Sequence, residues 1–278
     1  MKEADMQGRK GMMPGPALGA ALALAVTLAG PGIESLRGQA EVPLPALLEP
    51  EFLLSVAEIV DPASWRDAAT VLGTADGEIV AEHSLTVFDL LYVPGVVEGR
   101  ALAPGDRVQL FRLDRPIEDP ETGEWLGDLL VPTGVARVED VKGEVARVRV
   151  TDAFHEILVG DRVRVVDGLN GGGFGATAMA GPGGGRVVAF QEEKAIHPTF
   201  DTLFLRPEVA GALAAGQVVE LFRPGRIRDG IRLPDRVLGK AMVVRSHGPL
   251  AEAVTFELKG PDLAPGDLYR AVSSDPTP

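Results

Sequence analysis

The 278-residue sequence contains no cysteine, so the chain can form no disulfide and offers neither a thiolate nucleophile nor a cysteine ligand for zinc. A lipid anchor attached through cysteine is excluded for the same reason. Aromatic residues are scarce at 5%, with two tryptophans and two tyrosines, which disfavours a binding pocket lined by aromatic rings. The fold must therefore be stabilised mainly by the packing of aliphatic side chains.

Positive charge is also in short supply. The sequence has 27 lysines and arginines against 40 aspartates and glutamates, which gives a formal net charge of −13. Such an excess of negative charge argues against a nucleic-acid backbone or an anionic membrane surface as the main partner. Nucleic acid is therefore not expected among the partners.

The sequence shows no pattern typical of an active site or a metal site. It has no G-x-S-x-G motif, and no Gly-Lys-Ser/Thr follows the glycine triplets at 171–173 and 183–185. The acidic stretch 114–124 lacks the alternating ligands of a calcium loop and is expected to be a solvated hairpin loop. Ligand spacing is not found around any of the four histidines, His83, His155, His197 and His247. We therefore expect no metal, no cofactor and no catalytic residues.

The N-terminus is typical of a secretory signal peptide. Basic residues at Lys2, Arg9 and Lys10 precede an apolar run at 17–29 that is too short to span a bilayer, and small residues follow at positions 38 and 40, the two that a signal peptidase reads. The pattern predicts a signal peptide over 1–40, cleavage after Ala40 and export to the periplasm or the cell envelope. No membrane insertion is expected after cleavage.

Residues 41–75 are expected to be a short helical N-terminal segment. Helical spacing of apolar residues is seen at Phe52, Leu53, Val56 and Ile59. Asp61 and Pro62 suit the N-cap and the first position of a second helix, and Gly73 suits its C′ position. The segment is therefore predicted to be a small helical hairpin that leads into the first β unit.

From residue 77 onward, short alternating runs bounded by glycine, proline and aspartate are typical of β-strands. The glycine-rich stretch 168–185 interrupts these runs and is expected to be a flexible linker. The predicted organisation is a first β-barrel-like unit at 76–167, the linker at 168–185, a second β-barrel-like unit at 186–272 and a disordered tail at 273–278.

The two β units resemble each other in sequence. Residues 102–112 align without a gap with 213–223, and both segments end in Leu-Phe-Arg. Further on, Gly134 corresponds to Gly239, and a Gly-Asp pair at 160–161 corresponds to another at 266–267. The order and spacing of these matches indicate an internal duplication. We expect two tandem, mostly antiparallel barrels of five to seven strands each, because a unit of this size must close its sheet to bury one face.

The recurring Phe-Arg pairs are the candidate binding residues. They are Phe111, Arg112, Phe222 and Arg223, and Trp125 is added as a tryptophan near a predicted hairpin loop. We expect binding at exposed strand edges or at a cleft between the two units. The alternative is that each pair is a core phenylalanine beside a strand-edge arginine with a structural role.

Several short motifs resemble a known family. They include residues 119–127, Gly134 and 156–163 in the first unit, and 233–235, Gly239, 242–245 and 266–267 in the second. In order and spacing they are similar to the C-terminal β-barrel region of bacterial LysM-containing, peptidoglycan-binding envelope proteins, over about residues 78–271. The resemblance implies a β-barrel fold and an envelope location. The LysM module itself has no counterpart, because residues 41–75 are too few for it and lack its signature.

Taken together, these features predict an exported, non-catalytic accessory protein of the cell envelope. It would bind or scaffold another envelope component, either a protein or peptidoglycan. Two alternatives remain open: a barrel that binds a small ligand or glycan, and an envelope hydrolase with a carboxylate site that sequence spacing does not reveal.

Overall fold

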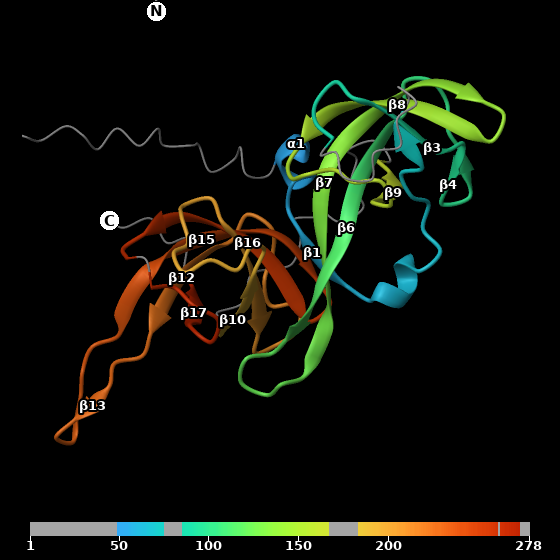
Figure 1. Cartoon of the computed structure of the whole chain (residues 1–278). Helices are drawn as coiled ribbons and strands as arrows, with labels where there is room; N and C mark the ends of the chain where they lie inside the picture. Colours follow the sequence, from blue (N-terminus) through green and yellow to red (C-terminus); the bar gives the residue numbers. More distant parts are fainter. Residues whose placement is uncertain (1–48, 75–84, 167–182, 261, 273–278) are drawn as a thin grey trace, which may run out of the picture. The chain divides into compact units, whose positions relative to one another are not determined.

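The computed structural model describes residues 49–74, 85–166, 183–260 and 262–272, which are mainly β (Figure 1). They all belong to one compact unit. The predicted signal peptide, most of the predicted linker and the predicted tail lie outside the described residues. Within the described residues, no helix has the length and apolar character needed to cross a membrane.

The N-terminal segment contains helical residues, as predicted, but not a helical hairpin. It consists of a single helical turn α1 (Pro50–Leu53), strand β1 (Glu58–Val60), the 3₁₀ turn η2 (Pro62–Trp65) and strand β2 (Gly73–Thr74). The predicted N-cap is present, because the Asp61 carboxylate accepts a hydrogen bond from the Ala63 N–H at 2.9 Å.

The helical spacing of the apolar residues has a different explanation. Leu53 and Val56 pack against Met242 and two other residues of the second barrel, whereas Ile59 lies in β1, which pairs with strand β7 of the first barrel. Tertiary packing thus overrides the local pattern. The prediction that Gly73 ends a helix was wrong, because Gly73 lies in β2.

The first unit is a seven-stranded antiparallel sheet that closes into a barrel. Its further strands are β3 (Leu90–Pro94), β6 (Arg107–Glu118), β7 (Trp125–Lys142), β8 (Val145–Ala153) and β9 (Arg162–Val165), in the order β2-β3-β8-β7-β6-β9, with β1 added beside β7. A bridge between Thr70 and Arg162 joins the residues before β2 to β9 and completes the ring. A small hairpin, β4 (Val96–Val97) and β5 (Arg100–Ala101), lies outside this sheet.

The second unit is a closed six-stranded barrel. It contains β10 (Gly184–Phe190), β11 (Thr202–Pro207), β12 (Val218–Arg223), β15 (Arg236–His247), β16 (Leu250–Leu258) and β17 (Leu268–Ala271), in the order β10-β11-β16-β15-β12-β17. A separate hairpin, β13 (Ile227–Arg228) and β14 (Ile231–Arg232), connects β12 to β15.

The second barrel begins earlier than the sequence predicted. Gly184 and Gly185 were assigned to the linker, but both belong to β10. A Cβ atom at Gly185 would overlap the Arg206 carbonyl of the neighbouring strand. Glycine at this position is therefore required by close packing and does not indicate a flexible chain.

The internal duplication is confirmed by the strand order, which is the same in both barrels. The corresponding strands are β2 and β10, β3 and β11, β6 and β12, β7 and β15, β8 and β16, and β9 and β17. The recurring glycines also have equivalent surroundings. A Cβ at Gly134 would meet the Asp152 carbonyl oxygen, and one at Gly239 would meet the Glu257 carbonyl oxygen. Each barrel encloses its own core of aliphatic side chains.

Candidate functional site

Arg112 and Arg223, two of the predicted binding residues, form equivalent ion pairs in the two barrels. Arg112 donates from Nε and Nη2 to the two carboxylate oxygens of Asp161 at 2.8 and 3.0 Å, and Arg223 does the same to Asp267 at 2.6 and 2.8 Å. Each carboxylate is buried and also accepts a hydrogen bond from the backbone N–H three residues earlier. These ion pairs thus stabilise the Gly-Asp turn before the last strand of each barrel.

The three aromatic residues among the predicted binding residues lie in different surroundings. Phe111 is fully buried and contacts the Trp65 ring edge-on, with the ring centroids 4.9 Å apart. Phe222 is half-buried beneath the guanidinium of Arg270, at 4.6 Å. Trp125 is half-exposed at the start of β7. The two Phe-Arg pairs occupy equivalent positions of separate barrels, an arrangement that matches the structural alternative stated above.

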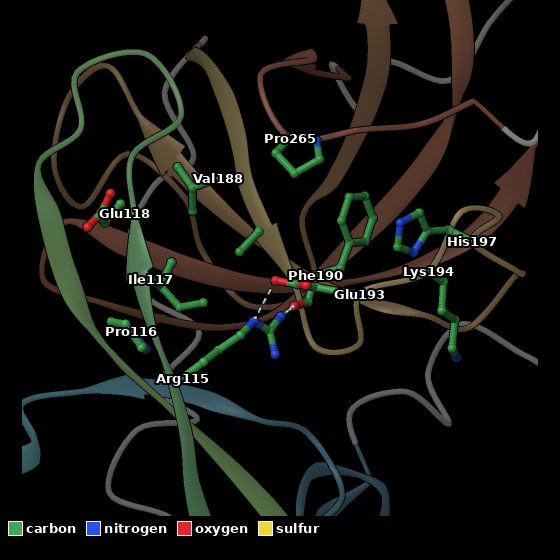
Figure 2. Close-up of a pocket in the computed structure, with 11 residues that line it drawn as sticks. Arg115, Pro116, Ile117, Glu118, Val188, Phe190, Glu193, Lys194, His197 and Pro265 are labelled. Carbon is green, nitrogen blue, oxygen red and sulfur yellow. Dashed lines mark hydrogen bonds and ion pairs between the residues drawn. The ribbon is translucent and has the colours of Figure 1, made fainter.

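A pocket of about 440 Å³ lies between β6 and the second barrel (Figure 2). On one side, the Arg115 guanidinium donates to the Phe190 carbonyl at 2.8 Å and pairs with Glu193 at 3.0 Å. Lys194, which also lines the pocket, pairs with Glu192 at 2.7 Å. Both cations therefore already have anionic partners.

The same pocket contains a histidine that the sequence analysis did not identify as a candidate. The His197 ring stacks on the Phe190 ring, 3.5 Å between centroids, and its Nδ1 lies 2.7 Å from Asp201 Oδ2. Both members of the pair are buried. The expectation that no histidine has a carboxylate at ligand spacing was therefore wrong for His197, because Asp201 follows it by four residues.

The acidic stretch 114–124 is not simply a solvated loop. It forms the end of the long β6–β7 hairpin, and Asp119 within it is buried. Arg206 of the second barrel donates to Asp119 at 2.8 Å and to Glu124 at 2.7 Å, and Arg186 pairs with Glu121. The hairpin of the first barrel is thus held by ion pairs on β10 and β11 of the second.

Glu58 in β1 links both barrels. Its Oε1 lies 2.7 Å from Nη2 of Arg164 in β9 and 2.7 Å from Nη1 of Arg245 in β15. Burial raises the pKa of Glu58, but the two guanidinium groups lower it by more, to about 2. The carboxylate is therefore ionised throughout the physiological pH range.

We call the surface of the second barrel beneath these segments the covered face. It consists of Val188, Phe204, Arg245, His247, Leu250 and Glu252. Ile59, Ile117 and Leu129, from β1 and the β6–β7 hairpin, pack on its apolar residues, and Phe204 is 0% exposed as a result. Extended segments from elsewhere in the chain thus bury the apolar residues of this face, whereas His247 at its edge stays 43% exposed.

The covered face also contains a buried acid. Glu252 is 0% exposed, and neither of its carboxylate oxygens has a hydrogen-bond partner among the described residues. Its nearest cation is His247, whose Nδ1 lies 3.5 Å from Oε1. Interaction with Glu252 raises the pKa of His247, aided by the charge of Glu58 and the Ile59 carbonyl, although burial acts in the opposite direction.

The first barrel has an equivalent surface, which we call the open face. It lines a surface pocket of about 420 Å³ and consists of Leu72, Tyr92, Asp140, Lys142, Val145 and Arg147. Strand register sets the correspondence. Tyr92 pairs with Arg147 as Phe204 pairs with Glu252, and Lys142 pairs with Val145 as His247 pairs with Leu250.

The two faces differ in exposure and in charge. Leu72 is 47% exposed and Tyr92 37%, whereas their counterparts Val188 and Phe204 are 3% and 0% exposed. At the position of Arg245 on the covered face, the open face has the opposite charge, Asp140. The open face therefore has the shape of a docking surface without an occupant among the described residues.

No group of three or more potential ligands that could hold a metal ion is found among the described histidines, aspartates and glutamates. No protein-family model matches the sequence, and no curated protein is significantly similar to it. The resemblance to the barrel region of LysM-containing envelope proteins thus stays a prediction.

Proposed function

We propose that this protein is an exported, non-catalytic scaffold of the cell envelope that binds protein partners through the open face of its first barrel. One observation carries the proposal. The same surface of the second barrel is covered by extended segments of the chain itself, whereas the open face is uncovered in the described part of the chain.

The covered face illustrates what this barrel surface binds. Its occupants are a short strand, β1, and a two-stranded hairpin, which supply aliphatic side chains to the centre and charged groups to the edge. Apolar side chains exposed together, such as Leu72 and Tyr92 on the open face, are typical of surfaces that bind other proteins. An extended segment of a protein is therefore the occupant that the open face fits best.

The envelope location rests on the N-terminal pattern and on the family resemblance. A basic start, a short apolar run and small residues at positions 38 and 40 support export. Peptidoglycan is the alternative target that the resemblance suggests. The exposed side chains of the open face provide one tyrosine, which is little aromatic surface for stacking on sugar rings.

The proposal can be tested with the purified full chain and its Tyr92→Asp variant, each offered to detergent-solubilised envelope proteins and to insoluble peptidoglycan. The wild-type chain is expected to retain specific envelope proteins, and Tyr92→Asp is expected to lose them, because a charge is placed at the centre of the open face. The matched control is Val209→Asp, which changes an equally apolar residue that is 70% exposed on the second barrel.

Circular dichroism would verify that each variant is folded. Equal capture by the wild-type chain and Tyr92→Asp would overturn the proposal. Retention on peptidoglycan alone, unaffected by Tyr92→Asp, would also overturn it and would favour a direct wall-binding role.

A further inference from the structure

The second barrel has a hairpin that projects from its strands (Figure 1, labelled β13). We call residues 224–235, which contain β13 and β14, the arm. Its large apolar side chains are exposed: Ile227 73%, Ile231 68% and Leu233 46%. Such exposure of three aliphatic residues on one short hairpin is unusual unless the hairpin binds something.

The arm is the counterpart of the β6–β7 hairpin. It joins β12 to β15, as the end of the β6–β7 hairpin joins the equivalent strands of the first barrel. The β6–β7 hairpin extends from the first barrel and packs Ile117 and Leu129 on the covered face of the second barrel. The duplication has thus produced two hairpins and two faces, and one hairpin is docked on one face within the chain. The arm and the open face are left over.

The charged groups of the two faces differ. On the covered face, Arg245 pairs with the carboxylate Glu58 of β1. On the open face, the equivalent residue is Asp140, which pairs with Lys142 at 3.2 Å, and the face also carries Arg147. The arm has three exposed arginines, Arg226, Arg228 and Arg232. Asp140 is the one acidic group among the residues that line the open face, so it is the group that an arginine of the arm would approach.

We propose that the arm of one copy of this protein docks on the open face of a second copy. The proposal rests on the function proposed above and names the partner. Since the arm and the open face are different surfaces, the contact between two copies is head-to-tail. In a dimer, one copy still has a free arm and the other a free open face. Association can therefore continue beyond a dimer, into a chain or a closed ring.

The first test is sedimentation equilibrium of the purified full chain over a range of concentrations. The average mass of the wild-type protein should rise with concentration above the monomer mass of 29.2 kDa. Ile231→Asp on the arm and Tyr92→Asp on the open face should each stay monomeric. The control Val209→Asp should associate like the wild-type protein.

A mixture of the two defective variants tests the head-to-tail geometry. Ile231→Asp retains an intact open face, and Tyr92→Asp retains an intact arm, so the mixture should form a dimer and nothing larger. Asp140→Arg should weaken the association of the wild-type arm by about tenfold or more, since it replaces an attractive charge with a repulsive one.

The outcomes separate the two proposals. A wild-type chain that stays monomeric, or a mixture that forms no dimer, would overturn the head-to-tail contact. If Tyr92→Asp nevertheless loses a captured envelope protein, the scaffold function stands and its partner is a different protein. If the purified chain associates and every variant associates equally, the contact does not involve the arm or the open face, and the inference is wrong.

Discussion

Replacing Glu58 with glutamine is expected to destabilise the protein strongly at neutral pH, because the Glu58 carboxylate holds together parts of both barrels. It lies 2.7 Å from guanidinium nitrogens of both Arg164 and Arg245. The three side chains are largely buried, with exposed fractions of 16%, 20% and 17%. Glutamine preserves the size of the side chain and removes its charge. The two guanidinium groups would then face each other in a partly dehydrated site without a counter-ion.

The expected magnitude follows from the pKa of Glu58. Its value falls from an ordinary 4.5 to about 2 in the folded protein. One pKa unit corresponds to about 1.4 kcal/mol, so the ionised carboxylate stabilises the fold by about 3 kcal/mol. This agrees with the roughly 3–5 kcal/mol lost when one partner of a buried ion pair is removed.

The sign of the pH dependence can also be predicted. Because the folded-state pKa is lower than the unfolded one, the stabilisation is complete above pH 4.5 and is lost as the pH falls towards 2. The difference in unfolding free energy between the wild-type protein and Glu58→Gln should thus shrink from about 3 kcal/mol at neutral pH to about 1 kcal/mol near pH 3.

Urea denaturation at several pH values, followed by circular dichroism, measures this difference. Glu51→Gln is the matched control, since Glu51 lies on the same segment in a weaker ion pair. Its side chain is 65% exposed, and its carboxylate lies 3.6 Å from Arg107 Nη1. It should change the unfolding free energy by about 0.5 kcal/mol or less. A Glu58→Gln effect that is equally large at neutral and acidic pH would refute the ion-pair explanation.

Two further predictions concern the second barrel. Gly239→Ala should lower the unfolding free energy by about 1–3 kcal/mol, because its Cβ would overlap a backbone carbonyl of the neighbouring strand; unchanged stability in urea would contradict this packing. His247→Gln should lose a stabilising interaction with Glu252 that depends on pH. Since the folded-state pKa of His247 lies above its ordinary value of 6.5, this stabilisation is present below pH 6.5 and disappears as the pH rises through the folded-state pKa. The wild-type protein and His247→Gln should therefore differ more at about pH 6 than at about pH 8 in thermal unfolding, and an equal difference would refute the role of His247.

The β architecture could be predicted because its signals are local. Alternation of valine with polar residues, together with the recurring Gly-Asp turns at 160–161 and 266–267, was enough to indicate two related barrels. The prediction of a short helical segment in 41–75 was confirmed by α1 and η2, but the helical hairpin was wrong because the apolar spacing is ambiguous. Val56 packs beside Met242 and Ile59 beside Phe204, so the two residues belong to separate apolar clusters although their spacing matches one face of a helix.

The candidate site could be predicted less well. Arg112 and Arg223 recur at equivalent positions of the two barrels, which predicted a binding role. Their equivalent ion pairs with Asp161 and Asp267 show that a shared structural role explains the recurrence equally well. The open face could not be found by motif, because it combines residues of three strands, β3, β7 and β8, with Leu72 just before β2. Its relation to the covered face, with Asp140 in the place of Arg245, depends on strand register and on bulges in β7 and β15 that sequence spacing does not reveal.

The docked β6–β7 hairpin has a kinetic and thermodynamic advantage that the arm does not share. The hairpin and the covered face belong to the same chain, and a short connection gives an effective concentration of one for the other in the millimolar range. Even a weak contact between them therefore stays formed. The arm must find its face on another molecule. A contact of the same intrinsic strength would therefore be broken in dilute protein and formed where the local concentration of this protein is high, so the degree of assembly would depend on how many copies lie close together.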